Sequence, residues 1–279
     1  MRLTLEGTTP VLDPIVLNLP TGNFAKAEFV ALGYTDFDVI CIGAAGGVGG
    51  GIYSPGASPQ NAIQGGSPGG GGIHRVQGLL SALGALTPVV IGAAGVDQPN
   101  NATNSVSGLA NGTDGGATTF DGTRCRASGG KGGKSPTSYS PAGGNSGGDG
   151  GIGNSTTAGG GALGSTAVGT PGADGTWDGT IGKGGGGGKG GNGIINTGVL
   201  TNAATPGGKG AYNSLNLAVM GLAGAVGPML VNAFPNILGG FGGGAKATPI
   251  NGSDAVYGTR VPGGFAFGAC FIKLTVGPA

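Results

Sequence analysis

Residues 37–51 read FDVICIGAAGGVGGG, and this stretch decides what kind of fold the chain can form. Its first part, Phe37–Ile42, is a short run rich in branched apolar residues, which is typical of a buried β-strand. The second part, residues 43–51, contains six glycines in nine positions. Glycine costs about 1 kcal/mol at an interior helix position, so no helix is expected to follow the strand. The chain is predicted to pass from a strand directly into a glycine segment.

Further strands are predicted towards both ends of the chain. They are short apolar runs broken by proline and glycine, and convincing helices are missing. A pair of strand-like runs also surrounds a turn near Gly84. The predicted strands are RLTL (2–5), VLDPIVLNL (11–19), AEFVAL (27–32), the two runs within VQGLLSALGALTPVVIGAAG (76–95), and a closing strand over 271–276 preceded by Phe265 and Phe267.

These strands predict a single all-β domain with little or no α-helix. Residues 1–99 and 251–279 are expected to form a β-sandwich framework. Residues 100–250 are expected to be a glycine-rich insertion packed as polyglycine or polyproline II helices. This division depends on the change in composition, because the glycine lies mostly between the two strand-rich ends.

The composition argues against a disordered coil and against several functions. The 279 residues include 71 glycines and 17 prolines, but only 9% are charged and 38% are hydrophobic. Disordered chains are charged and poorly hydrophobic, so this chain is expected to collapse or assemble. A net charge of +1 with no basic stripe excludes the usual footprint of a nucleic-acid binder. No signal peptide is recognised at the start, which favours intracellular assembly.

Three glycine-rich stretches share a period of three residues: 129–134 (GGKGGK), 147–152 (GGDGGI) and 184–192 (GGGGGKGGN). The polyproline II helix makes one turn per three residues and has no internal hydrogen bonds, so its backbone must bond to neighbours or water. Two glycine faces predict packing on two sides with the third side outward. The outward positions would carry Lys131, Lys134, Lys183 and Lys189. A collagen-like helix and a flexible linker are the alternatives.

The segment 210–245 has no charged residue and carries much of the aliphatic content of the chain. A membrane span of about 20 residues would fit its length, but prolines, glycines and asparagines interrupt it. A buried loop or subunit contact is favoured over a span and over an exposed apolar tip. The protein is therefore not expected to be an integral membrane protein.

Catalytic and metal sites are not predicted. The stretch 38–51 resembles the start of a dinucleotide-binding unit, but no helix follows it and no acidic residue appears before Asp97. GGKGGKS imitates a P-loop, but its first glycine position is Ser128. His74 is the only histidine and has no supporting nucleophile; it is expected in a loop or at a strand edge. Cys41, Cys125 and Cys270 imply no disulfide framework. No enzyme activity, cofactor or metal is expected.

The order of these motifs resembles the glycine-rich minor tail proteins of long-tailed bacteriophages that infect actinobacteria. A strand ends in VICIGAAGGVGGG (39–51), a later one in VVIGAAG (89–95), and GGATTFDGTRCRASGGKGG (115–133) follows. A glycine field and GGFAFGACFIKLTV (263–276) complete the pattern. The resemblance covers residues 24–279.

The resemblance implies a virion structural protein at the tail tip that contributes to host attachment. It also implies a homotrimer, contact with other tail proteins and contact with a component of the host cell envelope. The candidate receptor-contacting residues are Tyr139, Trp177, Asp178, Met229, Leu230 and Phe234. Packing within the glycine lattice or a trimer is the competing role for them. A free glycine-rich surface or ice-binding protein, and last a nucleotide-binding oxidoreductase, are the alternative functions.

Overall fold

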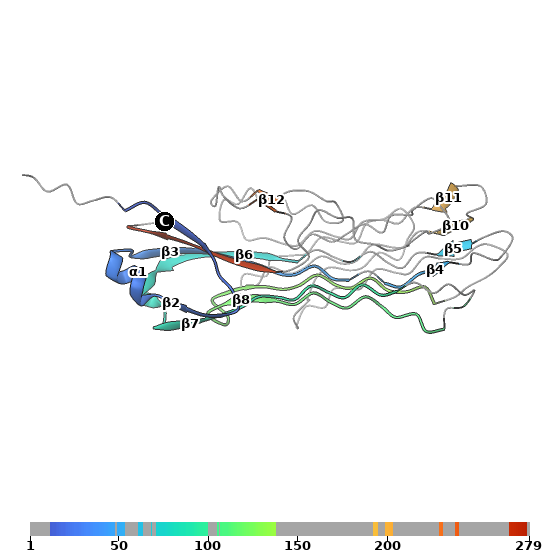
Figure 1. Ribbon diagram of the computed structural model, residues 1–279, viewed down its shortest axis with the longest axis horizontal. Helices are drawn as coiled ribbons and strands as arrows, with labels where there is room; N and C mark the ends of the chain where they lie inside the picture. Colours follow the sequence, from blue (N-terminus) through green and yellow to red (C-terminus); the bar gives the residue numbers. More distant parts are fainter. Residues whose placement is uncertain are drawn as a thin grey trace, which may run out of the picture.

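In the computed structural model, strand β3 (Asp36–Ile42) is one of the two inner strands of the first sheet (Figure 1). The structure describes residues 12–47, 49–53, 61–63, 68, 71–99, 105, 107–137, 192–194, 199–202, 229–230, 238–239 and 268–277. Within these ranges the regular structure is almost entirely β, as the sequence predicts.

The first sheet has four antiparallel strands in the order β1-β14-β3-β6. Strand β1 spans Ile15–Asn18, β6 spans Ile73–Leu79 and β14 spans Ala269–Thr275. Every residue of β3 is buried, because the sheet covers both of its edges and both of its faces are enclosed. The strands predicted at 37–42 and 271–276 are confirmed in β3 and β14. Phe265 and Phe267 lie outside the described residues.

The second sheet has the order β2-β7-β8-β9 and is also antiparallel. Its strands are β2 (Gly22–Ala25), β7 (Leu86–Val90), β8 (Thr118–Phe120) and β9 (Cys125–Ala127). The two runs predicted on either side of Gly84 are strands β6 and β7, but they do not pair with each other. A short 3₁₀ turn, η1 (Leu80–Ala82), leads the chain from one sheet to the other.

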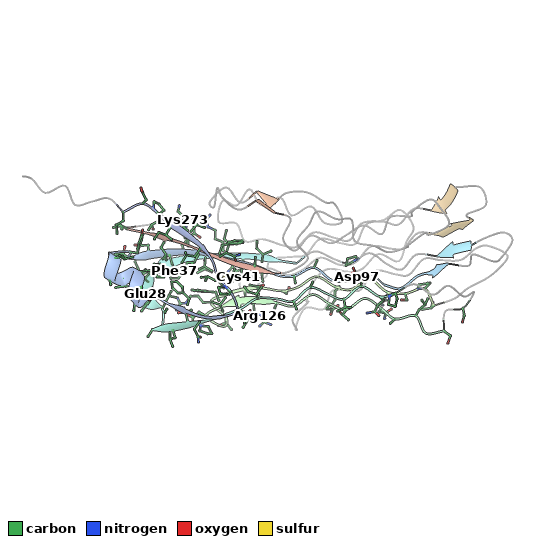
Figure 2. The ribbon with its side chains drawn as sticks, viewed as in Figure 1. Glu28, Phe37, Cys41, Asp97, Arg126 and Lys273 are labelled. Carbon is green, nitrogen blue, oxygen red and sulfur yellow. The ribbon has the colours of Figure 1, made fainter. Side chains whose placement is uncertain are left out.

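Side chains from both sheets form one hydrophobic cluster. Phe120 from the second sheet lies between Phe24 and Phe37, with ring-centroid distances of 6.2 and 6.0 Å. In Figure 2, Phe37 and Cys41 lie inside this crowded region. The two sheets with helix α1 (Ala27–Leu32) are called the strand framework below.

Helix α1 corrects the prediction of a strand at AEFVAL. The six residues make one short helical stretch that ends at Gly33, whose φ of +102° is open to glycine but strained for other residues. Lys26 at its start reaches across to the Leu80 carbonyl at 3.0 Å, and Phe29 stacks on Phe24 at 5.6 Å. The helical turn, the stacking of Phe29 on Phe24 and the long-range bond of Lys26 outweigh the β-propensity of the segment. The predicted strand at 2–5 lies outside the described residues, and of 11–19 only β1 is a strand.

A third sheet, called the distal sheet, lies at the opposite end of the molecule from α1 and β2 (Figure 1). Its order is β11-β10-β5-β4, with β4 at Ile52–Tyr53, β5 at Asn61–Ile63, β10 at Asn192–Ile194 and β11 at Val199–Asn202. Both the distal sheet and the second framework sheet draw strands from each side of residue 99.

A further short pair of strands lies within the segment predicted to be a subunit contact. Strand β12 (Met229–Leu230) pairs antiparallel with β13 (Leu238–Gly239). The predicted division into residues 1–99 with 251–279 and residues 100–250 stays a prediction.

Candidate functional site

Four glycine-rich segments leave the strand framework and run side by side towards the distal sheet (Figure 1). We call them together the glycine bundle: residues 43–51, 92–99, 110–116 and 128–135. Each is continuous with a framework strand, because they adjoin β3, β7, β8 and β9 respectively. The strands that build the core are therefore also the anchors of the bundle.

Segment 43–51 is hydrogen-bonded to segment 110–116 at every third residue, and the two run antiparallel. The N–H groups of Ala44, Gly47 and Gly50 donate to the carbonyls of Gly116, Thr113 and Ala110, at 3.0, 2.8 and 3.1 Å. A β-ladder repeats every two residues along a strand. The spacing of three instead matches a backbone that turns once per three residues.

The other two segments also bond to residues 43–51. The N–H groups of Gly130 and Gly133 donate to the carbonyls of Ala44 and Gly47 at 2.8 and 2.9 Å, again three residues apart and in parallel. Gly95 N–H donates to the Ala45 carbonyl at 2.8 Å. Segment 43–51 therefore bonds to all three other segments of the glycine bundle.

The outer segments are bonded to each other in the same way. Gly112 and Gly115 donate to the carbonyls of Gly133 and Gly130, at 2.8 and 2.9 Å, and Thr113 and Gly116 donate to those of Val96 and Ala93, at 3.2 and 2.8 Å. The bundle is therefore a lattice of backbone hydrogen bonds. The N–H and C=O groups that face its interior bond to neighbouring segments instead of to water.

The bundle leaves no room for a side chain where the glycines of segment 43–51 face segment 128–135. A Cβ atom at Gly43, Gly46 or Gly49 would lie 2.0, 2.2 or 2.6 Å from the carbonyl oxygens of Ser128, Lys131 and Lys134. The same three-residue step appears on both segments. Glycine is required here for close approach of two backbones.

Burial follows the same period. All described residues from 43 to 51 are buried, whereas in segment 128–135 every third residue is partly exposed. Those residues are Lys131 and Lys134, the positions for which outward faces are predicted; Lys183 and Lys189 lie outside the described residues. Lys131 forms an ion pair with Asp114 of the neighbouring segment, and Asp114 also accepts from Gly132 N–H at 3.0 Å.

The buried charges of the framework are engaged in structural contacts. Asp38 is 1% exposed and accepts from Arg75 Nε at 2.8 Å and from Gln77 Nε2 at 3.1 Å. Because Asp38 lies on β3 and both partners lie on β6, the pair ties the two strands together.

His74 lies in the outer strand β6, in agreement with a strand-edge position, but it is buried. Its Nδ1 accepts from Arg126 N–H at 3.0 Å, which joins β9 of the second sheet to β6 of the first. The only histidine of the chain therefore links the two sheets.

The three cysteines converge in the core although they are far apart in sequence. All are free and buried, and the Sγ atoms of Cys41 and Cys270 are 3.9 Å apart because these residues are direct partners on β3 and β14. Cys41 Sγ also donates to the Cys125 carbonyl at 3.5 Å. Burial, and then the neighbouring Cys125 and Cys270 thiols, raise the pKa of Cys41 well above its ordinary value. A buried neutral thiol is a poor nucleophile.

The framework end that faces away from the bundle carries a group of exposed apolar side chains. They lie on α1 or at the ends of β6, β7 and β14, where these elements meet (Figure 1). We call this group the apolar end: Val30, Leu32, Leu79, Leu86 and Val276.

The predicted receptor-contacting residues are not brought together by the described structure. Tyr139, Trp177, Asp178 and Phe234 lie outside the described residues. Met229 and Leu230 form β12. The strands of the distal sheet were not predicted from the sequence. The residues that could have indicated them are Ile52, Tyr53 and Ile63, which stand between proline- and glycine-rich stretches.

In the described part of the chain no group of three or more His, Cys, Asp or Glu side chains could hold a metal ion. None of the helices described there has the length and apolar character needed to cross a membrane. No family model matches the chain, and no curated protein matches it significantly.

Proposed function

We propose that the protein is a non-enzymatic structural component of a long-tailed bacteriophage tail tip and contributes to attachment to the host cell. The observation that carries the proposal is the three-residue period of hydrogen bonds between the glycine segments. This period supports packing as polyglycine II helices, extended to the whole insertion 100–250, on a β-sandwich framework. Such a bundle is a stiff spacer rather than a flexible tether.

The arrangement of the parts supports display at one end. The framework holds one end of each bundle segment, and the distal sheet lies at the other end (Figure 1). A spacer whose backbone groups bond to each other keeps its far end at a defined position. A surface that contacts the cell envelope before the rest of the particle needs such a fixed position.

The apolar end supports attachment of the framework to other subunits. Exposed large apolar side chains at one end of the framework favour a protein interface there. We infer that this end contacts other tail proteins or sister copies in a homotrimer at the tail tip. Several copies in one particle would add weak envelope contacts through effective concentration.

The ionisable groups of the core support a role without catalysis. Asp38 is engaged by Arg75 and Gln77, and His74 Nδ1 accepts from the backbone N–H of Arg126. The raised pKa of Cys41 keeps its thiol protonated. These groups hold strands together, and none of these contacts provides an activated nucleophile.

Adsorption by virions that carry substitutions at the predicted contacts tests the attachment role. Tyr139→Ala and Trp177→Ala are expected to slow adsorption by about tenfold, the loss of a typical anchor contact. Glu28→Gln, on α1 of the framework, is the control and should adsorb normally. Normal adsorption by every variant, with the protein present in the particle, would leave only an architectural role.

A further inference from the structure

Two of the three core cysteines are direct partners on neighbouring antiparallel strands. Cys41 on β3 pairs with Cys270 on β14, and their Sγ atoms are 3.9 Å apart. Both side chains are fully buried, and both thiols are free. The two sulfurs are therefore held side by side in the core, although 229 positions separate the residues in the sequence.

The backbone hydrogen bonds around this pair show that the two cysteines do not bond to each other through their backbones. Gly43 N–H donates to the Gly72 carbonyl at 2.8 Å, so Cys41, two residues earlier, also directs its N–H and C=O groups towards β6. On β14, the Cys270 carbonyl accepts from the N–H of Leu19, which follows β1, at 2.8 Å. The polar backbone groups of the two cysteines thus point away from each other, as in a non-hydrogen-bonded pair.

A non-hydrogen-bonded pair has the geometry that a disulfide needs. Its Cα atoms lie about 4.5 Å apart, and its side chains approach more closely than those of a hydrogen-bonded pair. Disulfides join residues whose Cα atoms are about 4.4–6.8 Å apart, with about 2.05 Å between the sulfurs. Closing the gap between the Sγ atoms, 3.9 Å in the reduced protein, therefore needs rotation of the side chains and no change of strand pairing.

The third thiol is held by a different contact. Cys125 lies on β9 of the second sheet, which pairs with β8 alone among the described strands. Its Sγ donates to the His74 carbonyl at 3.1 Å, and Cys41 Sγ contacts the Cys125 backbone carbonyl at 3.5 Å. No strand register aligns Cys125 with either of the other cysteines. The geometry therefore favours Cys41 and Cys270 as the reacting pair.

We propose that Cys41 and Cys270 are an oxidation site, at which a small peroxide converts the two thiols into a disulfide. One sulfur loses its proton and attacks a peroxide oxygen; the O–O bond breaks, and a sulfenic acid and water form. The second sulfur then attacks the first, the S–O bond breaks, and the departing hydroxide leaves as water with the second thiol proton. The sulfurs supply two electrons, and one hydrogen peroxide is reduced to two waters.

The bond would fasten β3 to β14 at the junction of the strand framework with the glycine bundle. Cys41, labelled in Figure 2, lies two residues before bundle segment 43–51, and Cys270 lies two residues after Gly268. Gly268 N–H donates to the Gly92 carbonyl of the bundle at 2.9 Å. Cross-links that close long loops restrict the unfolded chain most, and this one would span most of the sequence. The disulfide should therefore stabilise the folded protein.

Burial determines when the bond can form. Neither thiol has exposed surface, so an oxidant reaches the pair only when the framework opens locally, and the reaction is slow. Thiols stay reduced in a cytoplasm and oxidise outside it. The chain would therefore fold with free thiols in a reducing compartment and be fastened after leaving it. The site needs only an oxidising environment and does not depend on the proposed attachment role.

Treatment of the folded full-length protein with hydrogen peroxide, after removal of reductant, tests the proposal. Alkylation in denaturant should count three free thiols before treatment and one afterwards, and peptide mapping should find Cys41 joined to Cys270. Tm should rise by at least about 5 °C and fall back when a dithiol reductant is added. Three remaining thiols, a bond that involves Cys125, or a bond between two copies would overturn the proposal.

Single variants separate the pair from the third thiol. Cys125→Ser keeps both partners and should form the bond with the same rise in Tm, whereas Cys41→Ala and Cys270→Ala should show neither. Each variant is compared with its own reduced form, so that the effect of the substitution on stability cancels. The peptide map of the parent protein decides the pairing even if a variant does not fold. A rise in Tm for oxidised Cys41→Ala, or a mapped bond in the parent without a rise, would contradict the fastening of β3 to β14.

Discussion

The strand framework and the glycine bundle both have a buried interior, but different parts of the chain fill the two interiors. Around Phe120 the framework is filled by side chains from two sheets. Around residues 43–51 the bundle is filled by backbone, with carbonyl and N–H groups of neighbouring segments in direct contact. In Figure 2 the side chains crowd the framework and thin out along the described bundle, where Asp97 is labelled.

The difference shows how a chain with so much glycine can hold a defined structure. Glycine loses more conformational freedom on folding than any other residue, and it buries no side chain in return. The bundle offsets this cost in two ways. Its hydrogen bonds connect several segments, and each segment begins or ends next to a framework strand, so the framework aligns all four at one end.

The largest effect is expected from removing a framework side chain. Phe120→Ala deletes a fully buried ring that contacts Phe24 and Phe37. The free energy of unfolding should fall by about 3–5 kcal/mol, as for other buried phenylalanines. Denaturant unfolding followed by circular dichroism measures it. Val90→Ala, at an exposed position outside the apolar end, is the control and should change stability by no more than about 0.5 kcal/mol.

In the glycine bundle the opposite change, the addition of one methyl group, should lower the free energy of unfolding. Gly46→Ala would place a Cβ atom 2.2 Å from the Lys131 carbonyl oxygen, so two segments must move apart. We expect a loss of about 1–3 kcal/mol, the range for overpacked interiors. Gly84→Ala is the matched control, because its Cβ would lie 3.4 Å from the nearest atom. Similar stability of both variants would contradict close backbone packing in the bundle.

The local pattern of apolar residues in the sequence predicted much of the strand framework. The apolar runs at 37–42 and 271–276 are strands because burial of branched residues decides both their secondary structure and their place in the core. AEFVAL was predicted incorrectly, since its helix depends on Gly33, on the stacking of Phe29 on Phe24, and on the contact of Lys26 with Leu80, which is remote in sequence. Local propensity does not contain those contacts.

The candidate site was less predictable for a related reason. A period of three indicates which faces of a glycine segment pack, and it located Lys131 and Lys134 correctly at the less buried positions. It does not indicate which segments are neighbours. Which segments are neighbours depends on how strands β3, β7, β8 and β9 are placed in the two framework sheets. The contact of Cys41 with Cys270 depends in the same way on the pairing of β3 with β14.

A smaller effect is expected when the framework is titrated. Burial raises the pKa of Cys41 in the folded protein, whereas an unfolded cysteine ionises near pH 8.5, about its ordinary value. Above that pH the folded state binds more protons than the unfolded state, so stability falls as pH rises. The slope from this group is at most about 1.4 kcal/mol per pH unit. Thermal unfolding between neutral and alkaline pH measures it, and Cys41→Ala should flatten the profile.

The smallest effect is expected from the ion pair that joins two bundle segments. Lys131 and Asp114 are both partly exposed, so Lys131→Gln should cost no more than about 1 kcal/mol, and less at about 1 M salt. Asp114→Ala should cost more, because it removes both the ion pair and the acceptor for the N–H of Gly132. Denaturant unfolding of both variants at two salt concentrations separates the contributions. If Lys131→Gln were as harmful as Gly46→Ala, side-chain charges would hold the segments together, and the contrast between a backbone-filled bundle and a side-chain-filled framework would fail.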